Sequence, residues 1–427
     1  MARLYEYQGK EVLKKMGIPV PAGICVSTAK EAGKAARKIG KGTVIKAQVW
    51  ATGRFKAGGI KFAEGPQEAT KAAAALLGSE IKGLKVEKVL VEEQLEVARE
   101  LYVGVIVSNS HKIRGPILIF SSEGGSSIEE VQKRNPDRIG TLNVDYLKGV
   151  TVADAKKLLS KVVFQGKKPT AALLDELART VCTVYQSFVQ YDARSIEVNP
   201  LIVTKDNRVL AADCHCTIDD NSVYRHPEFE ILVARDMDRP PTELEKKAWL
   251  SIEEGDYRGT GYFSQMVTQY PGDGWLGFHG IGGGGAMLGA SAFVTRGFKI
   301  ANYADTSGDP AASKIYLVIK YILSLPIDGY VLMGATLANQ EQWHHAHALV
   351  KIFREFAKVK PGFPVIMLVA GNKEAESHEI IKKGFKDLPL RWELYGREYI
   401  YKTDFMGDRV MALVKEYQNE RKAGRRI

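Results

Sequence analysis

The fold can be worked out from the segment Asp192–Asp213, which reads DARSIEVNPLIVTKDNRVLAAD. It contains two apolar runs rich in β-branched residues, Ile196–Val203 and Val209–Ala212. Between them lies the turn cluster Lys205-Asp206-Asn207. Two such runs joined by a short polar turn are typical of a β-hairpin, so we predict one here.

The register of this hairpin predicts which side chains share a face. If the turn is centred on Asp206, the numbers of paired residues sum to about 412, and Asn199 lies opposite Asp213. Glu197 precedes Asn199 by two residues and points to the same face. Carboxylate and amide oxygens with open positions for water and phosphate suit Mg²⁺. The alternative is a polar edge hairpin on an ordinary sheet.

Length and composition limit the class of protein. A chain of 427 residues, 45% of them hydrophobic, can form two or three domains. Apolar runs of the length of a membrane span and a signal peptide are both missing, and the four cysteines are irregularly spaced, so we expect a cytoplasmic protein. The net charge of +10 is spread along the chain without a basic, aromatic stripe. We therefore expect phosphate, CoA or polycarboxylate ligands and no nucleic acid.

The first half of the chain mixes helices and strands, and a Pro-rich segment at Arg235–Pro241 marks the boundary to the second half. The sequence Thr28-Ala29-Lys30-Glu31 predicts a capping box that opens a helix. Further helices are predicted at Glu6–Met16, Pro66–Leu77, Ala153–Ser160 and Ala171–Val189, and strands at Gly42–Val49, Val89–Glu93, Leu101–Ser108 and Ile117–Phe120.

In the second half, short apolar strands alternate with helical patterns, which predicts a doubly wound parallel sheet. In such a sheet, ligands bind beyond the carboxyl ends of the strands, here at residues 279–285, 304–308 and 334–342. The strands are predicted at Trp275–His279, Ile300–Tyr303, Tyr330–Met333 and Val365–Val369, and the helices at Ala286–Thr295, Ala311–Leu323, Trp343–Ala357 and Glu374–Lys383, with a fraying end after Tyr417.

A glycine-rich segment near the N-terminus is a candidate phosphate site. Lys46 ends a predicted strand before Thr52–Gly59, which contains Gly53, Arg54 and Lys56. Glycines let the backbone approach phosphate oxygens, and the basic side chains supply compensating charge. The segment does not have the ending of a Walker-type phosphate-binding loop. A flexible hairpin tip is the alternative.

Two further patterns suggest ligands less specifically. Glu92 and Glu100 border a strand end, where a carboxylate can accept from a ribose hydroxyl or an adenine amine; a solvated face is the alternative. The glycines of Gly280–Gly285 precede a predicted helix, whose N-terminus would attract an anion other than NAD.

Two groups of possible metal ligands have plainer interpretations. His344 and His347 share a helix face, but no carboxylate or cysteine joins them at ligand spacing for zinc. Cys214 and Cys216 share a strand face that excludes His215, so we expect them to pack in a core.

Several motifs in residues 1–230 occur together, among them Tyr5–Lys10, Gly17–Pro21, Glu197–Pro200 and Asn221–Arg225. In combination they resemble the succinyl-CoA synthetase β subunit. The resemblance implies an ATP-grasp domain over residues 1–238, with an inner lobe at 20–100. It implies Mg²⁺ on Asn199 and Asp213, and a role for Glu197 in orienting a histidine that is phosphorylated on a partner subunit. The motifs are Tyr5-Glu6-Tyr7-Gln8-Gly9-Lys10, Gly17–Pro21, Ile45–Gln48, Gly53–Gly59, Arg99–Tyr102, Glu123–Gly125, Glu197–Pro200 and Asn221–Arg225, and the implied ATP-binding residues are Lys46, Gly53, Arg54, Phe55, Glu92, Leu95 and Glu100.

The second half departs from succinyl-CoA synthetase and is similar to ATP-citrate lyase at Ala301–Gly308 and Leu337–Asn339. This implies a flavodoxin-like domain over residues 245–420 that binds citrate. The arginine that would hold citrate has no counterpart in Val369-Ala370-Gly371-Asn372, where Arg296, Lys299 or Lys373 could substitute. The residues that would bind the acid are Gly282, Gly283, Gly284, Ser307, Gly308 and Asn339.

Taken together, the sequence leads to the hypothesis of an ADP-forming acid–CoA ligase that makes citryl-CoA, like the large subunit of citryl-CoA synthetases. A separate α-type subunit would bind CoA and carry the phosphohistidine, in an α2β2-like assembly. Succinate or malate in place of citrate is one alternative. A stand-alone ATP-grasp carboxylate–amine ligase and a non-catalytic nucleotide sensor are the others.

Overall fold

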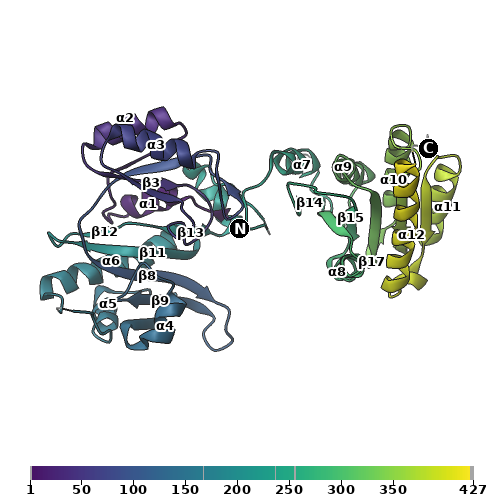
Figure 1. Ribbon diagram of the computed structural model, residues 1–427. Coiled ribbons are helices and arrows are strands. Elements are labelled where there is room, and N and C mark those ends of the chain that lie inside the picture. Colours follow the sequence, from purple (N-terminus) through teal and green to yellow (C-terminus); the bar gives the residue numbers. More distant parts are fainter. Residues whose placement is uncertain (1, 167, 236, 254–255, 424–427) are drawn as a thin grey trace. The chain divides into compact units, whose positions relative to one another are not determined.

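A computed structural model describes residues 2–166, 168–235, 237–253 and 256–423, without the side chains of residues 335–339. The contacts within the chain divide it into two compact units, Met1–Pro241 and Thr242–Ile427 (Figure 1). We call them unit 1 and unit 2 and describe each by itself. Among the described residues, no helix combines the length and the apolar character that crossing a membrane requires.

Unit 1 contains a small lobe built on a four-stranded antiparallel sheet. Helices α2 and α3 cover one face of this sheet, and their alanines pack on its apolar side chains (Figure 1). The Thr28 side chain accepts from the Glu31 N–H, so the predicted capping box is confirmed. The strand order is β2 (Gly23–Val26), β7 (Val89–Glu93), β3 (Thr43–Ala47) and β4 (Ile60–Ala63), and the helices are α2 (Ala29–Ile39) and α3 (Pro66–Leu76); β5 (Glu80–Ile81) and β6 (Leu84–Lys85) form a separate hairpin.

The larger lobe of unit 1 is built on a seven-stranded sheet, against which the long helix α6 packs. The sheet order is β1 (Ala2–Arg3), β13 (His215–Ile218), β11 (Ala193–Thr204), β8 (Val97–Ser108), β9 (Gly115–Ser121) and β10 (Ile139–Asn143), with β12 (Val209–Ala211) paired to β11. The helices are α1 (Glu6–Lys15), α4 (Ile128–Arg134), α5 (Val152–Leu159) and α6 (Ala171–Gln190).

The hairpin formed by β11, β12 and β13 has the register that the sequence predicts. Leu201 pairs with Ala211 and Val203 with Val209, so the residue numbers sum to 412. The same sum holds where β11 pairs with β13, because Glu197 lies across from His215. Between these two ladders the register leaves Asn199 opposite Asp213.

Unit 2 is a doubly wound sheet of the flavodoxin-like kind. Its five parallel strands, numbered along the chain, lie in the order 2-1-3-4-5, and β14 adds an antiparallel strand at one edge. The sheet order is β14 (Tyr262–Gln265), β16 (Lys299–Asp305), β15 (Trp275–Ile281), β17 (Gly329–Glu341), β18 (Pro364–Leu368) and β20 (Arg391–Tyr395), and β19 (Ala370–Asn372) pairs with β17.

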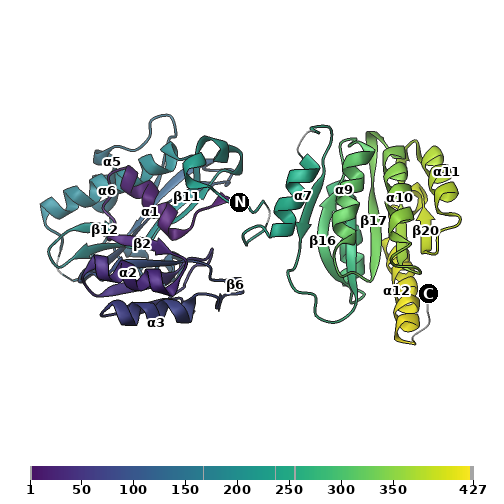
Figure 2. The same cartoon turned by 90° about the horizontal axis from the view of Figure 1, so that it is seen from above.

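Helices cover both faces of this sheet, and each face has its own apolar core (Figure 2). Helices α8 and α12 contact each other and the strands on one face, and helices α7, α9, α10 and α11 follow one another along the other. The helices are α7 (Glu243–Glu253), α8 (Gly283–Val294), α9 (Ala312–Leu323), α10 (Trp343–Phe356), α11 (Glu374–Phe385) and α12 (Thr403–Lys422).

One predicted helix end in unit 2 needs correction. Helix α8 begins at Gly283 and not at Ala286, because its glycines take helical geometry in the first turn after the positive φ of Gly282. Residues 418–422, where a fraying helix end is predicted, belong to α12. Residues 424–427 lie outside the described part of the chain.

Two fully buried histidines predict a specific acid sensitivity of unit 2. Burial lowers the pKa of His345 to about 3, with a contribution from His344, and it lowers the pKa of His279 well below its ordinary value. An unfolded histidine titrates near pH 6.5, so the unfolded chain binds more protons below that pH. The free energy of unfolding should therefore fall as the pH drops from about 6.5, by about 2 kcal/mol per histidine at pH 5.

Denaturant unfolding of the full chain followed by tryptophan fluorescence would measure this, since four of the five tryptophans lie in unit 2. His345→Gln should reduce the pH dependence, whereas His347→Gln on the exposed side of the same helix should leave it unchanged. A free energy of unfolding that is equal at pH 7 and pH 5 would contradict the prediction.

Candidate functional site

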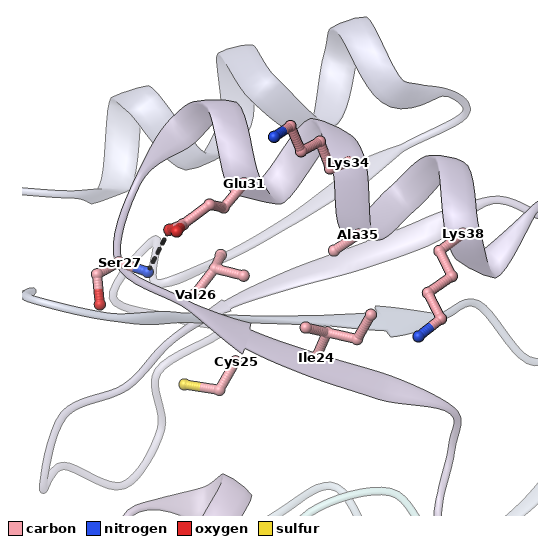
Figure 3. Close-up of a pocket in the computed structure, with 8 residues that line it drawn as sticks. All are labelled: Ile24, Cys25, Val26, Ser27, Glu31, Lys34, Ala35 and Lys38. Atoms are coloured by element: carbon pink, nitrogen blue, oxygen red, sulfur yellow. Dashed lines mark hydrogen bonds between the residues drawn. The ribbon is translucent and has the colours of Figure 1, made fainter.

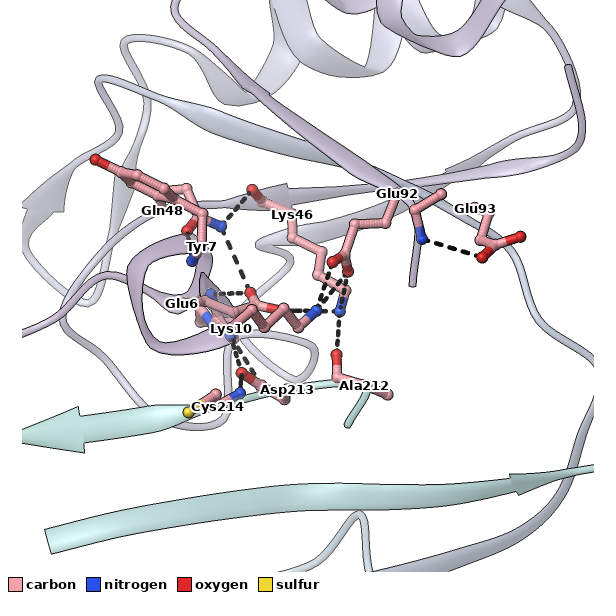
Figure 4. A network of polar contacts seen from close by, with 12 residues as sticks. Glu6, Tyr7, Lys10, Lys46, Gln48, Glu92, Glu93, Ala212, Asp213 and Cys214 are labelled. Carbon is pink, nitrogen blue, oxygen red and sulfur yellow. Dashed lines mark hydrogen bonds and ion pairs between the residues drawn. The ribbon is translucent and has the colours of Figure 1, made fainter. Parts of the chain in front are cut away.

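A buried cluster of charged side chains connects the small lobe of unit 1 with the hairpin (Figure 4). Glu6 comes from α1, Lys46 from β3, Glu92 from β7 and Asp213 from the turn between β12 and β13. Lys10, one helical turn after Glu6, completes the part of the cluster that contains Lys46. Segments that are far apart in sequence therefore meet at one point.

The two lysines share the same two carboxylates. The Lys46 Nζ lies 2.9 Å from Glu6 Oε1 and 2.8 Å from Glu92 Oε2, and it donates to the Ala212 carbonyl at 2.7 Å. The Lys10 Nζ lies 2.8 Å from Glu6 Oε1 and 2.6 Å from Glu92 Oε1. The carboxylates of Glu6 and Glu92, which also bind Lys10, thus hold the ammonium of Lys46 in a fixed place beside the hairpin.

Arg54 forms the other half of the cluster. Its Nη1 lies 2.7 Å from Glu6 Oε2 and donates to the Ala47 carbonyl at 3.1 Å. Its Nη2 donates to both carboxylate oxygens of Asp213, at 2.9 and 2.8 Å. Only 2% of the Arg54 side chain is exposed, so the guanidinium is enclosed by its partners.

The electrostatics of the cluster keep Glu6, Lys46 and Arg54 charged. Burial alone would raise the pKa of Glu6, but Arg54, Lys10 and Lys46 lower it well below its ordinary value. Burial opposes the charge on Lys46 as well, yet Glu6, Glu92 and Asp213 raise its pKa. A buried charge that loses its partner is costly, so the cluster forms as a unit.

The hairpin side chains predicted to hold a metal have protein partners. Asp213 accepts from the Cys214 N–H at 2.7 Å in addition to its bonds from Arg54. Asn199 Oδ1 accepts from the Gly125 N–H at 2.8 Å, and its Nδ2 donates to the Ser126 carbonyl at 3.0 Å. The loop at residues 125–126 therefore fixes the amide of Asn199.

Glu197 stands on the same face as Asn199 and is mostly buried. Tyr102 on β8 donates to Glu197 Oε2 at 3.3 Å. Burial raises the pKa of Glu197 and nearby Asp213 adds to this, while His215, Tyr102 and Asn199 act in the opposite direction. A carboxyl with these neighbours is suited to hold or exchange a proton with a group placed beside it.

The remaining predicted nucleotide residues lie around the cluster but do not all join it. Glu92 is buried and paired with the lysines, whereas Glu100 is exposed. Gly53 has a φ of +65°, which favours glycine, and it precedes Arg54 in an exposed loop whose Phe55 is 65% exposed. Leu95 is partly exposed in the segment between β7 and β8.

The chemistry of the donors fits a magnesium nucleotide. Asn199 on β11 and Asp213 in the turn between β12 and β13 supply one amide and one carboxylate oxygen, and Mg²⁺ prefers such oxygen ligands while keeping several waters. Lys46 and Arg54 supply two fixed positive charges on the small-lobe side, where phosphates would need compensation.

In unit 2, the predicted acid-binding loops are joined by a carboxylate. The Gly282 N–H donates to Asp305 Oδ1 at 3.0 Å, and the Ser307 hydroxyl donates to Asp305 Oδ2 at 2.8 Å. Gly308, with a φ of +73°, turns the chain next to Ser307, while Gly283 and Gly284 open α8 with open space where a Cβ atom would lie. Asn339 lies on β17, and its side chain is outside the described part.

The three possible substitutes for the missing arginine are not equivalent. Arg296 follows the C-terminal end of α8, where it bonds to Asp404 and Asp408, and Lys299 begins β16 and donates to the Pro271 carbonyl. Both therefore lie at the edge of the sheet opposite the acid-binding loops, and neither can take the arginine's place. Lys373 follows β19 at the carboxyl edge and pairs with Glu376 at 3.0 Å.

The other predicted clusters have structural roles. Cys214 and Cys216 are buried in the core of the larger lobe, which confirms the packing interpretation. Within the described residues, no group of three or more possible ligands of the His, Cys, Asp and Glu types could hold a metal ion. A surface pocket of about 370 Å³ between β2 and α2 is lined by Ile24, Cys25, Val26, Ser27, Glu31, Lys34, Ala35 and Lys38, none of which belongs to the charged cluster (Figure 3).

Sequence reasoning missed the residues at the centre of these sites. Glu6 and Lys10 appeared only as part of a motif, although their spacing of four on one helix places them on the same face. Asp305 was part of a loop motif without a role of its own. The signal that could have identified them is a charged residue at the end of a helix or strand, close to the proposed ligand: Glu6 begins α1 and Asp305 ends β16.

Comparisons with known proteins show the family to which this chain belongs. A model of the ATP-grasp domain family matches residues 3–203. The β subunit of the GDP-forming succinate–CoA ligase from Thermus thermophilus is 35% identical over 383 residues, covering 89% of this chain and 93% of that one. That of the ADP-forming succinate–CoA ligase from Ignicoccus hospitalis is 32% identical over 386 residues, with the same coverage.

Among solved structures, an ATP citrate lyase from Methanothrix soehngenii in complex with citrate and coenzyme A superposes with a TM-score of 0.71. It covers 93% of this chain and 96% of that chain at 16% identity, which supports the fold alone. The fold and the match to the ATP-grasp domain family define a protein of the ATP-grasp class. Within this class, the chain belongs to the family of succinate–CoA ligase β subunits and is an acid–CoA ligase chain.

Proposed function

We propose that this chain is the nucleotide-binding subunit of an ADP-forming acid–CoA ligase, which converts an acid, CoA and ATP into an acyl-CoA, ADP and phosphate. The observation that supports this most is the convergence of Lys46, Arg54 and Asp213 in one buried cluster beside the hairpin. A second, α-type subunit binds CoA and carries the histidine that is phosphorylated, as the relatives' description as β subunits suggests.

Each site residue of unit 1 then has a defined role. Lys46 and Arg54 hold the phosphates of the nucleotide, and Asn199 and Asp213 hold Mg²⁺, which neutralises charge as the phosphoryl group moves. Glu197, whose pKa burial raises, orients the incoming histidine of the partner subunit by accepting its N–H. Tyr102 fixes Glu197 in turn by its hydrogen bond.

Unit 2 binds the acid in this proposal, and citrate is our first candidate. The segments Ala301–Gly308 and Leu337–Asn339 resemble those of ATP-citrate lyase, and Asp305 joins the first of them to the glycines at the start of α8. Lys373 is the one of the three proposed cations that lies at the carboxyl edge, so it is the candidate to pair with a carboxylate of the acid.

Succinate is the second candidate, because relatives of 35% and 32% identity are described as succinate–CoA ligases. Malate, the third acid considered, would bind through the same loops of unit 2. A thioester-formation assay with the purified two-subunit enzyme, ATP and Mg²⁺ separates the acids. We expect kcat/KM to be largest for citrate; a preference for succinate would end the citrate proposal while leaving the ligase proposal intact.

The same assay distinguishes the ligase from the other classes. The chain alone should form no thioester, and activity should appear only when the CoA-binding subunit is added. Amide-bond formation by the chain alone would favour a carboxylate–amine ligase. Nucleotide binding without turnover under every combination would favour a sensor.

A further inference from the structure

The bond between Arg54 and Asp213 occupies the carboxylate that the proposed function gives to the metal. Both oxygens of Asp213 accept from the same nitrogen, Arg54 Nη2, at 2.9 and 2.8 Å. The side chain of Asp213 is 16% exposed, so few directions of approach remain open to it.

The other half of the guanidinium is anchored independently. Arg54 Nη1 lies 2.7 Å from Glu6 Oε2 on α1 and 3.1 Å from the Ala47 carbonyl on β3. Losing Asp213 as a partner would therefore free Nη2 without releasing the side chain. Because the guanidinium has a rigid fork, the freed Nη2 stays on the side that faces the hairpin.

A metal ion and Arg54 compete for Asp213. Mg²⁺ binds a carboxylate oxygen at about 2.0–2.1 Å and demands near-octahedral geometry, and the hydrogen bonds from Nη2 to both oxygens leave it fewer directions of approach. Two positive charges at one carboxylate would also repel each other. Conversely, a phosphate oxygen can replace Asp213 as the acceptor for Nη2.

We propose that Arg54 and Mg²⁺ exchange on Asp213, so that metal binding by Asp213 and phosphate binding by Arg54 favour each other. The inference rests on the proposed nucleotide site and adds a coupling within it. Metal at Asp213 releases Nη2 for a phosphate, and a phosphate on Nη2 releases Asp213 for the metal. Glu6 is the positioning residue that keeps Arg54 in place during the exchange.

The test is the affinity of the full chain for ADP in the presence of EDTA, measured by calorimetry for a double-mutant cycle of Arg54→Ala and Asp213→Asn. Asp213→Asn replaces the carboxylate by a neutral amide, which competes more weakly for Arg54, so ADP should bind about fivefold more tightly without metal, at the low end of typical coupling. When Arg54 is also replaced by Ala, the same substitution should change the affinity by less than about twofold.

The reciprocal measurement uses Mn²⁺ and no nucleotide. Arg54→Ala frees Asp213, so Mn²⁺ should bind about fivefold more tightly. Lys82→Ala is the matched control, because Lys82 is an exposed cation that donates to the Thr52 carbonyl beside the same loop and does not contact Asp213. Its effect on the affinity for Mn²⁺ should be below about twofold.

The outcomes separate this inference from the function on which it rests. Two results would overturn the exchange. One is that Asp213→Asn leaves the affinity for ADP unchanged or weakens it. The other is that Asp213→Asn tightens ADP binding equally in chains with Arg54 and with Arg54→Ala. If the wild-type chain binds ADP neither with nor without Mg²⁺, the proposed nucleotide site itself fails. Thermal unfolding of each variant shows whether the compared chains are folded. If the Asp213→Asn chain is not folded, the Mn²⁺ titration still tests the exchange, because it uses only Arg54→Ala and its control.

Discussion

Replacing Lys46 with Met is expected to lower kcat/KM for ATP by two to three orders of magnitude, the range seen when one preorganised charge is removed from an active site. The Lys46 ammonium is fixed by Glu6, Glu92 and the Ala212 carbonyl at 2.7–2.9 Å. Its removal takes away a cation for the phosphates and the link between β3 and the hairpin. The assay is steady-state thioester formation by the two-subunit enzyme with ATP varied.

The matched control is Lys71→Met, since Lys71 is exposed on α3 in the same lobe. It should change kcat/KM by less than about twofold, because an exposed and solvated charge contributes little. If Lys46→Met and Lys71→Met have equal effects, Lys46 has no place in nucleotide binding.

Replacing Glu6 with Ala is expected to destabilise unit 1 by about 3–5 kcal/mol. The side chain of Glu6 is 1% exposed and lies within 2.9 Å of three cations, those of Lys10, Lys46 and Arg54. Without it, these buried charges would share only Glu92 and Asp213. Denaturant unfolding of the full chain, followed by circular dichroism, measures this loss of free energy in the transition in which unit 1 unfolds.

Glu11→Ala provides the control on the same helix. Glu11 lies 3.6 Å from Lys15 and both side chains are about half exposed. A pair of this kind contributes about 0–1 kcal/mol. A Glu6→Ala chain as stable as the Glu11→Ala chain would contradict the account of the cluster.

The sequence predicted those features that depend on neighbours along the chain. The turn at Lys205–Asn207 and the β-branched runs beside it determine the register of β11 and β12, because the side-chain period of a strand is two. The Thr28 capping box was also predictable, because it depends only on Thr28 and the nearby Glu31. The alternation of strands and helices in unit 2 predicted the doubly wound sheet.

The features that were missed depend on contacts between distant segments. Nothing in the local sequence of Arg54 indicates that Glu6 and Asp213 will meet it, so a residue expected to be available for phosphate is instead fully paired. The C-terminal helix was underestimated because its mean hydropathy is low. Its apolar residues at Met406, Val410 and Val414 nevertheless recur at helical spacing and pack on the sheet.

The most direct test of the central claim is a crystal structure of the full chain with ADP and Mn²⁺, using the anomalous signal of the metal. The account predicts one manganese peak at about 2.2 Å from an oxygen of Asp213 and the amide oxygen of Asn199, with Arg54 Nη2 turned to a phosphate. A manganese–nucleotide complex elsewhere on the chain, with Arg54 still bonded to both oxygens of Asp213, would contradict it.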